Sequence, residues 1–204
     1  MVLYSRQKHV DVGGFSIVSS KKVSDYALLE AAYLIGQMLG DRQDILKAMA
    51  KNKVRFAIMA HNEYTTQIPE HSDLQPRLYW NKRARGLGAT FERPAVSCGE
   101  ENLLLYPKDP YSKENILIHE FAHAIHNMGL SETDSTFDER LEATYDAAVK
   151  QRLWKGKYAG RNHHEYWAEG VQSWFGTNRE NDFDHNHVNT RAELKQYDPR
   201  LAQL

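Results

Sequence analysis

The chain has 204 residues, of which 41% are hydrophobic and 26% charged, a length and composition that predict one compact domain with its own core. A formal net charge of -1 without a run of Lys or Arg gives no electrostatic footprint for nucleic acid or an anionic membrane surface, so neither partner is predicted. No stretch approaches the roughly 18 apolar residues of a membrane span, and residues 1–10 lack the apolar centre of a signal peptide. We therefore predict a soluble chain, and leave its compartment open because a secretion signal could have been removed.

The first sixty residues predict scaffold elements. Ser24 is typical of a helix N-cap, apolar residues recur in helical phase up to residue 39, and Gly40 ends the pattern. Residues 41–51 predict a second helix. Residues 54–60 are rich in β-forming side chains and are the best candidate for a central strand.

The segment that follows is less regular. Residues 62–95 carry three prolines and the step Gly86-Leu87-Gly88, which predicts long surface loops near a cleft rather than a linker. Cys98 is the only cysteine, so an internal disulfide is excluded, and its predicted role is packing.

The most informative motif is His119-Glu120-Phe121-Ala122-His123. An α-helix places positions i and i+4 one above the other, so both imidazoles can point at one ion, and the pattern is typical of a zinc-activated water. On a helical wheel the two histidines lie opposite an apolar face formed by Leu117, Ile118, Phe121, Ile125 and Met128. Because the chain holds 10 His, a chance match in an ordinary helix is the alternative interpretation.

Zinc in a catalytic site needs a third protein ligand. The metzincin extension is disfavoured, because it requires Gly at position 126 and His at position 129, where this chain has His126 and Gly129. Glu165, 42 residues after His123, opens a second amphipathic helix in which Glu165 and Glu169 share a face. We predict that Glu165 binds the metal and that Glu169 accepts the outer ring N–H of His119. The alternative is that Glu165 belongs to a capping box begun by Asn162.

Together, HEFAH and EYWAE resemble the gluzincin metallopeptidases, and within them the peptidases similar to anthrax lethal factor. The resemblance covers residues 113 to about 175 and does not extend to the substrate choice of lethal factor. It implies a catalytic tyrosine seven residues before the glutamate ligand, a place that Tyr158 occupies, with its phenol donating to the oxyanion. It also implies a sheet edge before the active helix, supplied by residues 100–105, although an ordinary buried strand is equally compatible with the sequence.

The remaining elements are outside the predicted centre. Thr136-Phe137-Asp138-Glu139 predicts a capping box for a helix that runs to about residue 154. Residues 182–187 contain several potential ligands, but we interpret them as a hydrogen-bonded loop rather than a second metal site. The same reasoning makes His126, His163 and His164 exposed groups or outer partners of the metal site.

The predicted fold is therefore α+β: a single zincin-like domain over residues 1–204, mainly helical, with a small twisted sheet whose edge strand borders the cleft. Residues 1–95 form its scaffold lobe, and residues 96–204 carry the edge strand and both site helices.

The predicted function is hydrolysis of a peptide or protein substrate. His119, His123 and Glu165 hold one Zn²⁺ per chain, Glu120 is the general base, and Tyr158 stabilises the oxyanion. Two alternatives stay open, namely a zinc hydrolase of a non-peptide amide and a catalytically weak zinc-binding module. Oligomeric state is not predicted.

Overall fold

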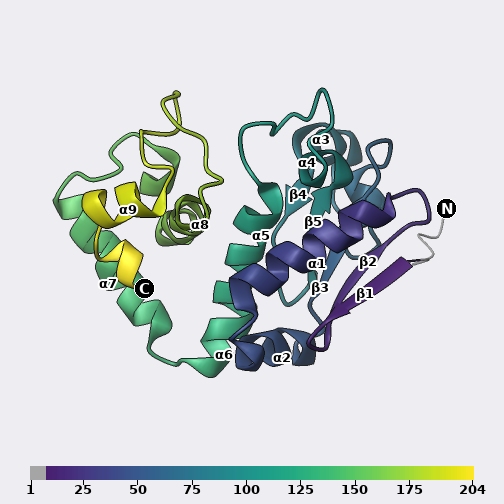
Figure 1. Ribbon diagram of the computed structural model, residues 1–204, viewed down its shortest axis with the longest axis horizontal. Coiled ribbons are helices and arrows are strands. Elements are labelled where there is room, and N and C mark those ends of the chain that lie inside the picture. The colour runs from purple at the N-terminus through teal and green to yellow at the C-terminus, as the bar shows by residue number, and fades with distance from the viewer. Residues whose placement is uncertain (1–7) are drawn as a thin grey trace.

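One mixed sheet of five strands organises the computed structural model, which describes residues 8–204 (Figure 1). The strands lie in the order β1-β2-β3-β5-β4, with β1 and β4 antiparallel to their neighbours and the three inner strands parallel. Their bounds are β1 Lys8–Val12, β2 Phe15–Ser19, β3 Arg55–Met59, β4 Gly86–Leu87 and β5 Ala95–Gly99. The α+β fold is thus confirmed.

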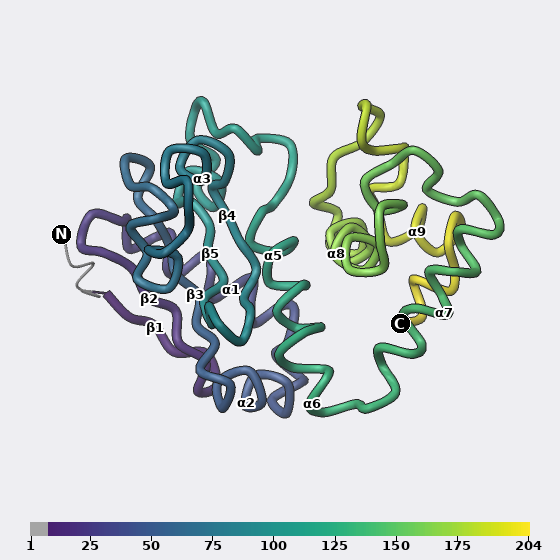
Figure 2. The backbone as a smooth tube through the Cα atoms, turned by 180° about the vertical axis from the view of Figure 1, so that it is seen from behind, coloured from purple at the N-terminus to yellow at the C-terminus, as the bar shows by residue number. Residues whose placement is uncertain are grey.

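The helices fall into two groups (Figures 1 and 2). Helices α1 to α4 lie around the sheet, while α7 and α9 form the opposite side of the molecule. Helices α5 and α8 lie between these groups and pack directly on each other. The bounds are α1 Asp25–Leu39, α2 Gln43–Lys51, α3 Arg77–Arg83, α4 Glu100–Leu103, α5 Ile116–Ile125, α6 Ser131–Thr133, α7 Phe137–Lys150, α8 His163–Trp174 and α9 Arg191–Tyr197, with a π-helical turn, His126–Leu130, after α5.

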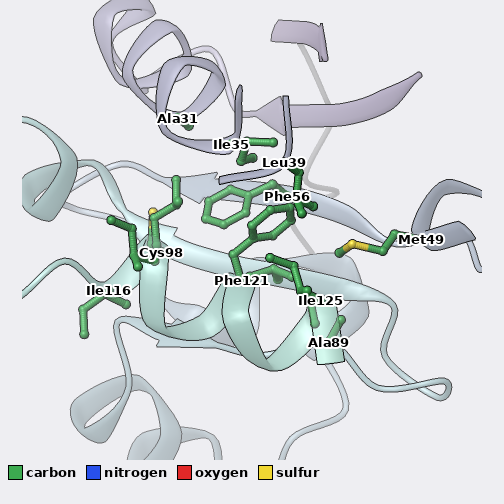
Figure 3. Close-up of a cluster of buried hydrophobic side chains, with 14 of the residues drawn as sticks. Ala31, Ile35, Leu39, Met49, Phe56, Ala89, Cys98, Ile116, Phe121 and Ile125 are labelled. Carbon is green, nitrogen blue, oxygen red and sulfur yellow. The ribbon is translucent and has the colours of Figure 1, made fainter. Parts of the chain in front are cut away.

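The two faces of the sheet are buried unequally. Alternation along β3 sends Phe56 and Ile58 into the main core, while Ala57 and Met59 join a small cluster on the other face. The main core packs under α1, α2 and α5, as the close-up in Figure 3 shows around Phe121 and Phe56. It continues without a break to Leu201 near the end of the chain, so both helical groups share it.

Several local predictions are confirmed. Helix α1 ends at Leu39, before Gly40, α2 ends at Lys51, and β3 is the middle strand of the sheet. Residues 1–7 lie outside the described residues, so most of the segment that was considered for a signal peptide falls there. No helix within residues 8–204 is both long enough and apolar enough to cross a membrane.

The predicted edge strand at residues 100–105 is wrong. Strand β5 ends at Gly99, is buried throughout and lies between β3 and β4, and the next residues form the short helix α4. The chain turns there because the Glu100 carboxylate accepts hydrogen bonds from the backbone N–H groups of Ser24 and His61, and because Leu105 has φ +53°. The positive φ of Leu105 is incompatible with an extended strand. The edge beside the cleft is β4 instead.

The helix predicted to reach residue 154 stops earlier. Helix α7 ends at Lys150, because Arg152 and Trp154 adopt left-handed φ values of +60° and +57°. The predicted capping box is also wrong: the Thr136 hydroxyl donates to Asp134 and makes no cap hydrogen bond.

Candidate metal centre

Helix α5 begins directly after Asn115, a residue type that is favoured as a helix N-cap. The Asn115 side chain accepts a hydrogen bond from the backbone N–H of Ile118, which caps the helix start. Phe121 is buried at 0% exposure on one side of the helix, and the predicted apolar face is buried as a whole. The opposite side carries His119 and His123, whose Nε2 atoms lie 3.2 Å apart.

Helix α8 supplies the third side chain. The Asn162 side chain accepts the backbone N–H of Glu165 at 2.9 Å, so Asn162 is the N-cap, as the alternative interpretation expected. No hydrogen bond among the described residues returns from the Glu165 side chain to the Asn162 backbone, so the capping box of that interpretation is not formed. Glu165 Oε2 then lies 3.2 Å from His119 Nε2 and 3.4 Å from His123 Nε2. Among the residues that the structure describes, His119, His123 and Glu165 are the group of three potential ligands that could hold a metal ion, with ligand atoms within 4.8 Å of one another.

This donor set fits a cation. Two imidazole nitrogens and a carboxylate oxygen point at one small volume, and Glu165 Oε2 is buried without a hydrogen bond of proper geometry. Burial raises the pKa of Glu165, but the adjoining His119 and His123 rings outweigh it and hold that pKa well below its usual range. Burial alone would lower the pKa of His119, but the close approach of the Glu165 carboxylate and the charges of the neighbouring carboxylates raise that pKa to about 10. Nitrogen and oxygen ligands of this kind suit Zn²⁺.

A glutamine that the sequence analysis missed orients His119. His119 Nδ1 lies 2.8 Å from Gln172 Oε1, whereas Glu169 Oε1 is 3.6 Å away. The Gln172 amide nitrogen donates to the backbone carbonyl of Asn115 at 3.2 Å, which leaves its oxygen free to accept the His119 N–H. With Nδ1 donating to Gln172, Nε2 is the ring nitrogen of His119 that faces the proposed metal position, and a bound cation would replace its proton there.

A sequence signal for Gln172 existed. Positions 165, 169 and 172 follow the i, i+4, i+7 spacing of one helix face, so Gln172 belongs to the same stripe as both glutamates. Glu169, the partner predicted for His119, is buried on that stripe but lies beyond hydrogen-bond distance of Nδ1.

Glu120 lines the same cleft, which encloses about 650 Å³ between β4, α3, α5 and α8. The edge strand passes close to its side chain. A Cβ atom added at Gly88 would lie 3.4 Å from Glu120 Oε2, and one added at Gly86 would lie 3.3 Å from Glu120 Cγ. The Gly-Leu-Gly step thus lets β4 run directly past the predicted general base.

Tyr158 reaches the site from a short 3₁₀ turn before α8. Its hydroxyl lies 3.4 Å from Glu165 Oε1, and the guanidinium of Arg161 covers its ring at 4.1 Å. Burial, together with the charge of Glu165, raises the pKa of Tyr158 to about 12. The phenol therefore keeps its proton at neutral pH and is available as a donor.

The loop at residues 182–187 is hydrogen-bonded, as predicted, but it also reaches the cleft. Asp182 Oδ1 accepts the backbone N–H groups of Asp184 and His185 and lies 3.0 Å from His185 Nδ1. His185 Nε2 lies 3.2 Å from Glu169 Oε2. The sequence analysis missed this link, because nothing in the local pattern indicates which buried carboxylate the loop meets.

His126, His163 and His164 form a separate group. His126 is buried rather than exposed, and its Nε2 lies 2.6 Å from Asp138 Oδ1. His164 is exposed and its Nδ1 lies 3.4 Å from His126 Nδ1, while His163 packs beside it with ring centroids 4.1 Å apart. Among the described residues, no side-chain hydrogen bond, ion pair or ring contact joins this group to His119 or His123; the link to His123 is the helical backbone hydrogen bond from the N–H of His126.

Comparison with known proteins gives one informative similarity. No protein-family profile and no curated protein sequence matches the chain. Among solved structures, it is similar to the PRO-PRO endopeptidase PPEP-2 from Paenibacillus alvei, with a TM-score of 0.56 and 18% identity over 92% of this chain and 94% of the other. The chain has the fold of that endopeptidase. The similarity supports the expected peptidase fold, and it gives no support to the particular resemblance to lethal factor.

Proposed function

We propose that the chain is a zinc-dependent endopeptidase. The observation that carries this proposal is the convergence of His119, His123 and Glu165 from two helices onto one point of the cleft. Glu120 and Tyr158 line that same cleft, which supplies a base and a hydrogen-bond donor beside the ligand set. The similarity to an endopeptidase of nearly the same length supports the reaction class.

Each side chain has a role that follows from its chemistry. A zinc ion held by His119, His123 and Glu165 would supply a Lewis acid that lowers the pKa of a water molecule and polarises the scissile carbonyl. Glu120 accepts a proton from the attacking water and returns it to the leaving amine. The Tyr158 hydroxyl donates a hydrogen bond to the oxyanion of the tetrahedral intermediate.

The walls of the cleft suit an extended peptide. Strand β4 is an edge strand of the sheet and lines the cleft, so a substrate backbone can pair with it. Tyr79 and Trp80 of α3 add an aromatic wall. Since the similar structure is a PRO-PRO endopeptidase, peptides that contain a Pro-Pro bond are the first substrates to test, beside a general peptide library.

The metal content of the purified chain and of Glu165→Ala tests the ligand set. We expect one zinc per chain in the parent, and in Glu165→Ala a loss of affinity beyond the about 10- to 100-fold that follows removal of an outer partner. Mass spectrometry after extensive washing measures the zinc. Glu180→Ala, which removes an exposed carboxylate, is the matched control and should keep its zinc. A parent that binds no zinc even after reconstitution would contradict the proposed function.

Tyr158→Phe tests the oxyanion donor. The variant keeps the ring and loses the hydroxyl, so we expect kcat to fall about 10²- to 10³-fold with unchanged zinc content and little change in KM. Steady-state kinetics on the best peptide substrate measure the effect. Tyr26→Phe, at a residue that is 74% exposed on α1, is the control. Equal activity of Tyr158→Phe and the control would remove Tyr158 from the mechanism.

A further inference from the structure

We propose that His185 is a positioning residue of the proposed metal site, through which the loop at residues 182–187 holds both Glu169 and Tyr158 in place. The inference rests on the proposed function, because it assigns His185 a role toward the zinc ligands and the oxyanion donor. His185 is buried and lines the cleft, yet it is not one of the three potential ligands.

The first link runs from His185 to Glu169. Glu169 is only 2% exposed, and such a buried carboxylate needs partners for both oxygens. Its Oε2 lies 3.2 Å from His185 Nε2 and accepts a hydrogen bond from the Asn178 amide at 3.0 Å. Its Oε1 lies 3.6 Å from His119 Nδ1. His185 thus fixes the rotation of the carboxylate that faces the outer side of a proposed zinc ligand.

The second link anchors His185 itself. Its Nδ1 lies 3.0 Å from Asp182 Oδ1, so each ring nitrogen faces a carboxylate. An imidazolium donates at both nitrogens and satisfies both partners. Arg179 holds the other oxygen of Asp182, with its Nε at 2.9 Å from Oδ2. The imidazole is therefore fixed at both ends, and it cannot rotate without breaking a charged contact.

The third link joins the same loop to Tyr158. The backbone N–H of Tyr158 donates to the carbonyl of Asp184 at 2.7 Å, and the rings of Tyr158 and His185 are nearly parallel, at 18°, with centroids 6.3 Å apart. The guanidinium of Arg161 lies over the Tyr158 ring, 4.1 Å from its centroid, and donates a hydrogen bond to Asp184 Oδ1 at 3.1 Å. The loop therefore fixes the tyrosine backbone and borders its ring, so a change at His185 should move two functional side chains together.

Substitution of His185 tests the proposal with readouts that do not depend on turnover. His185→Leu removes both ring contacts at similar volume, and Asp182→Asn keeps the loop amides bonded but removes the charge behind the imidazole. His187→Leu is the matched control, since His187 belongs to the same loop, is exposed and contacts Tyr197 instead. Zinc affinity by chelator competition, the absorption spectrum of the Co²⁺-substituted chain, kcat and KM would be measured for each.

We expect His185→Leu to weaken zinc binding by up to about 10-fold, the lower end of what loss of a direct outer partner causes, because His185 acts through Glu169, and to shift the Co²⁺ spectrum. We also expect kcat to fall by about 10-fold or more with KM nearly unchanged, because Tyr158 acts only in the transition state. Asp182→Asn should change the same quantities in the same direction by less, and His187→Leu should match the parent.

The outcomes separate the two proposals. If the parent binds zinc and cleaves peptides while His185→Leu has the parent's zinc affinity, spectrum and kcat, the positioning role is wrong and the proposed function stands. If the parent binds neither zinc nor Co²⁺, the proposed function falls and this inference falls with it. Should His185→Leu fail to fold by circular dichroism, Asp182→Asn decides: a parental spectrum and affinity overturn the proposal, and the expected shift supports it.

Discussion

Glu120→Gln is expected to keep one zinc per chain and to lose about 10²- to 10⁴-fold in kcat, the usual contribution of a general base. Glutamine has nearly the shape of glutamate, so the cleft beside Gly88 accommodates it. Its amide oxygen cannot take a proton from water at neutral pH. Glu120 is not among the three residues that could hold the metal, so the substitution leaves the proposed ligand set intact.

The measurement pairs kinetics with metal analysis on the same preparation. Turnover of the best peptide substrate and zinc by mass spectrometry would be compared for the parent, Glu120→Gln and Glu139→Gln, an exposed glutamate on α7 that serves as control. A fully active Glu120→Gln would refute the general-base role. A parent that binds zinc yet cleaves no peptide or amide would instead favour the non-catalytic zinc-binding module.

Short-range features of the site were predictable from the sequence. The two histidines of α5 share a face because they are four residues apart, and Asn162 caps α8 because it stands three residues before Glu165. Both depend on contacts within one turn of helix. The opposite, apolar face of α5 follows from the same periodicity, and all five of its predicted core residues are buried.

Partners that meet across long sequence separations were not predictable in the same way. Gln172 lies 53 residues from His119 in the sequence, and its amide oxygen takes the hydrogen-bond position at His119 Nδ1 that was predicted for Glu169. His185 was recognised as part of a polar loop, but the carboxylate that it meets depends on how that loop packs on α8. Tertiary packing decides such pairs, and one sequence carries no periodic signal for them.

The edge strand could not be predicted from the sequence for a different reason. Strand β4 has only two residues, Gly86 and Leu87, too few for any alternating pattern. Residues 100–105 read as a more convincing strand, yet the carboxylates of Glu100 and Glu101 are buried and bonded to distant groups, Ser24 and Arg85 among them. The need of buried charges for partners outweighed the local pattern.

Phe121→Ala should destabilise the fold by about 3–5 kcal/mol, the usual cost of removing a buried phenylalanine. Phe121 lies in the centre of the motif but points away from the proposed metal position and is 0% exposed. Its ring packs edge-to-face against Phe15 and Phe56 at centroid distances of 5.4 and 6.3 Å. The cavity left by the ring would lie between α5 and the sheet, so the helix that carries both histidines would lose its main anchor.

Denaturant unfolding with a chelator present measures this effect without the contribution of bound metal to stability. Phe91→Ala makes the same substitution at a site that is 65% exposed, and we expect its free energy of unfolding to stay within about 0.5 kcal/mol of the parent. A loss below about 1 kcal/mol in Phe121→Ala would contradict the packing of α5 on the sheet. Because that packing directs His119 and His123 into the cleft, the expected loss would show that the apolar half of the motif fixes the direction of the half that carries the two histidines.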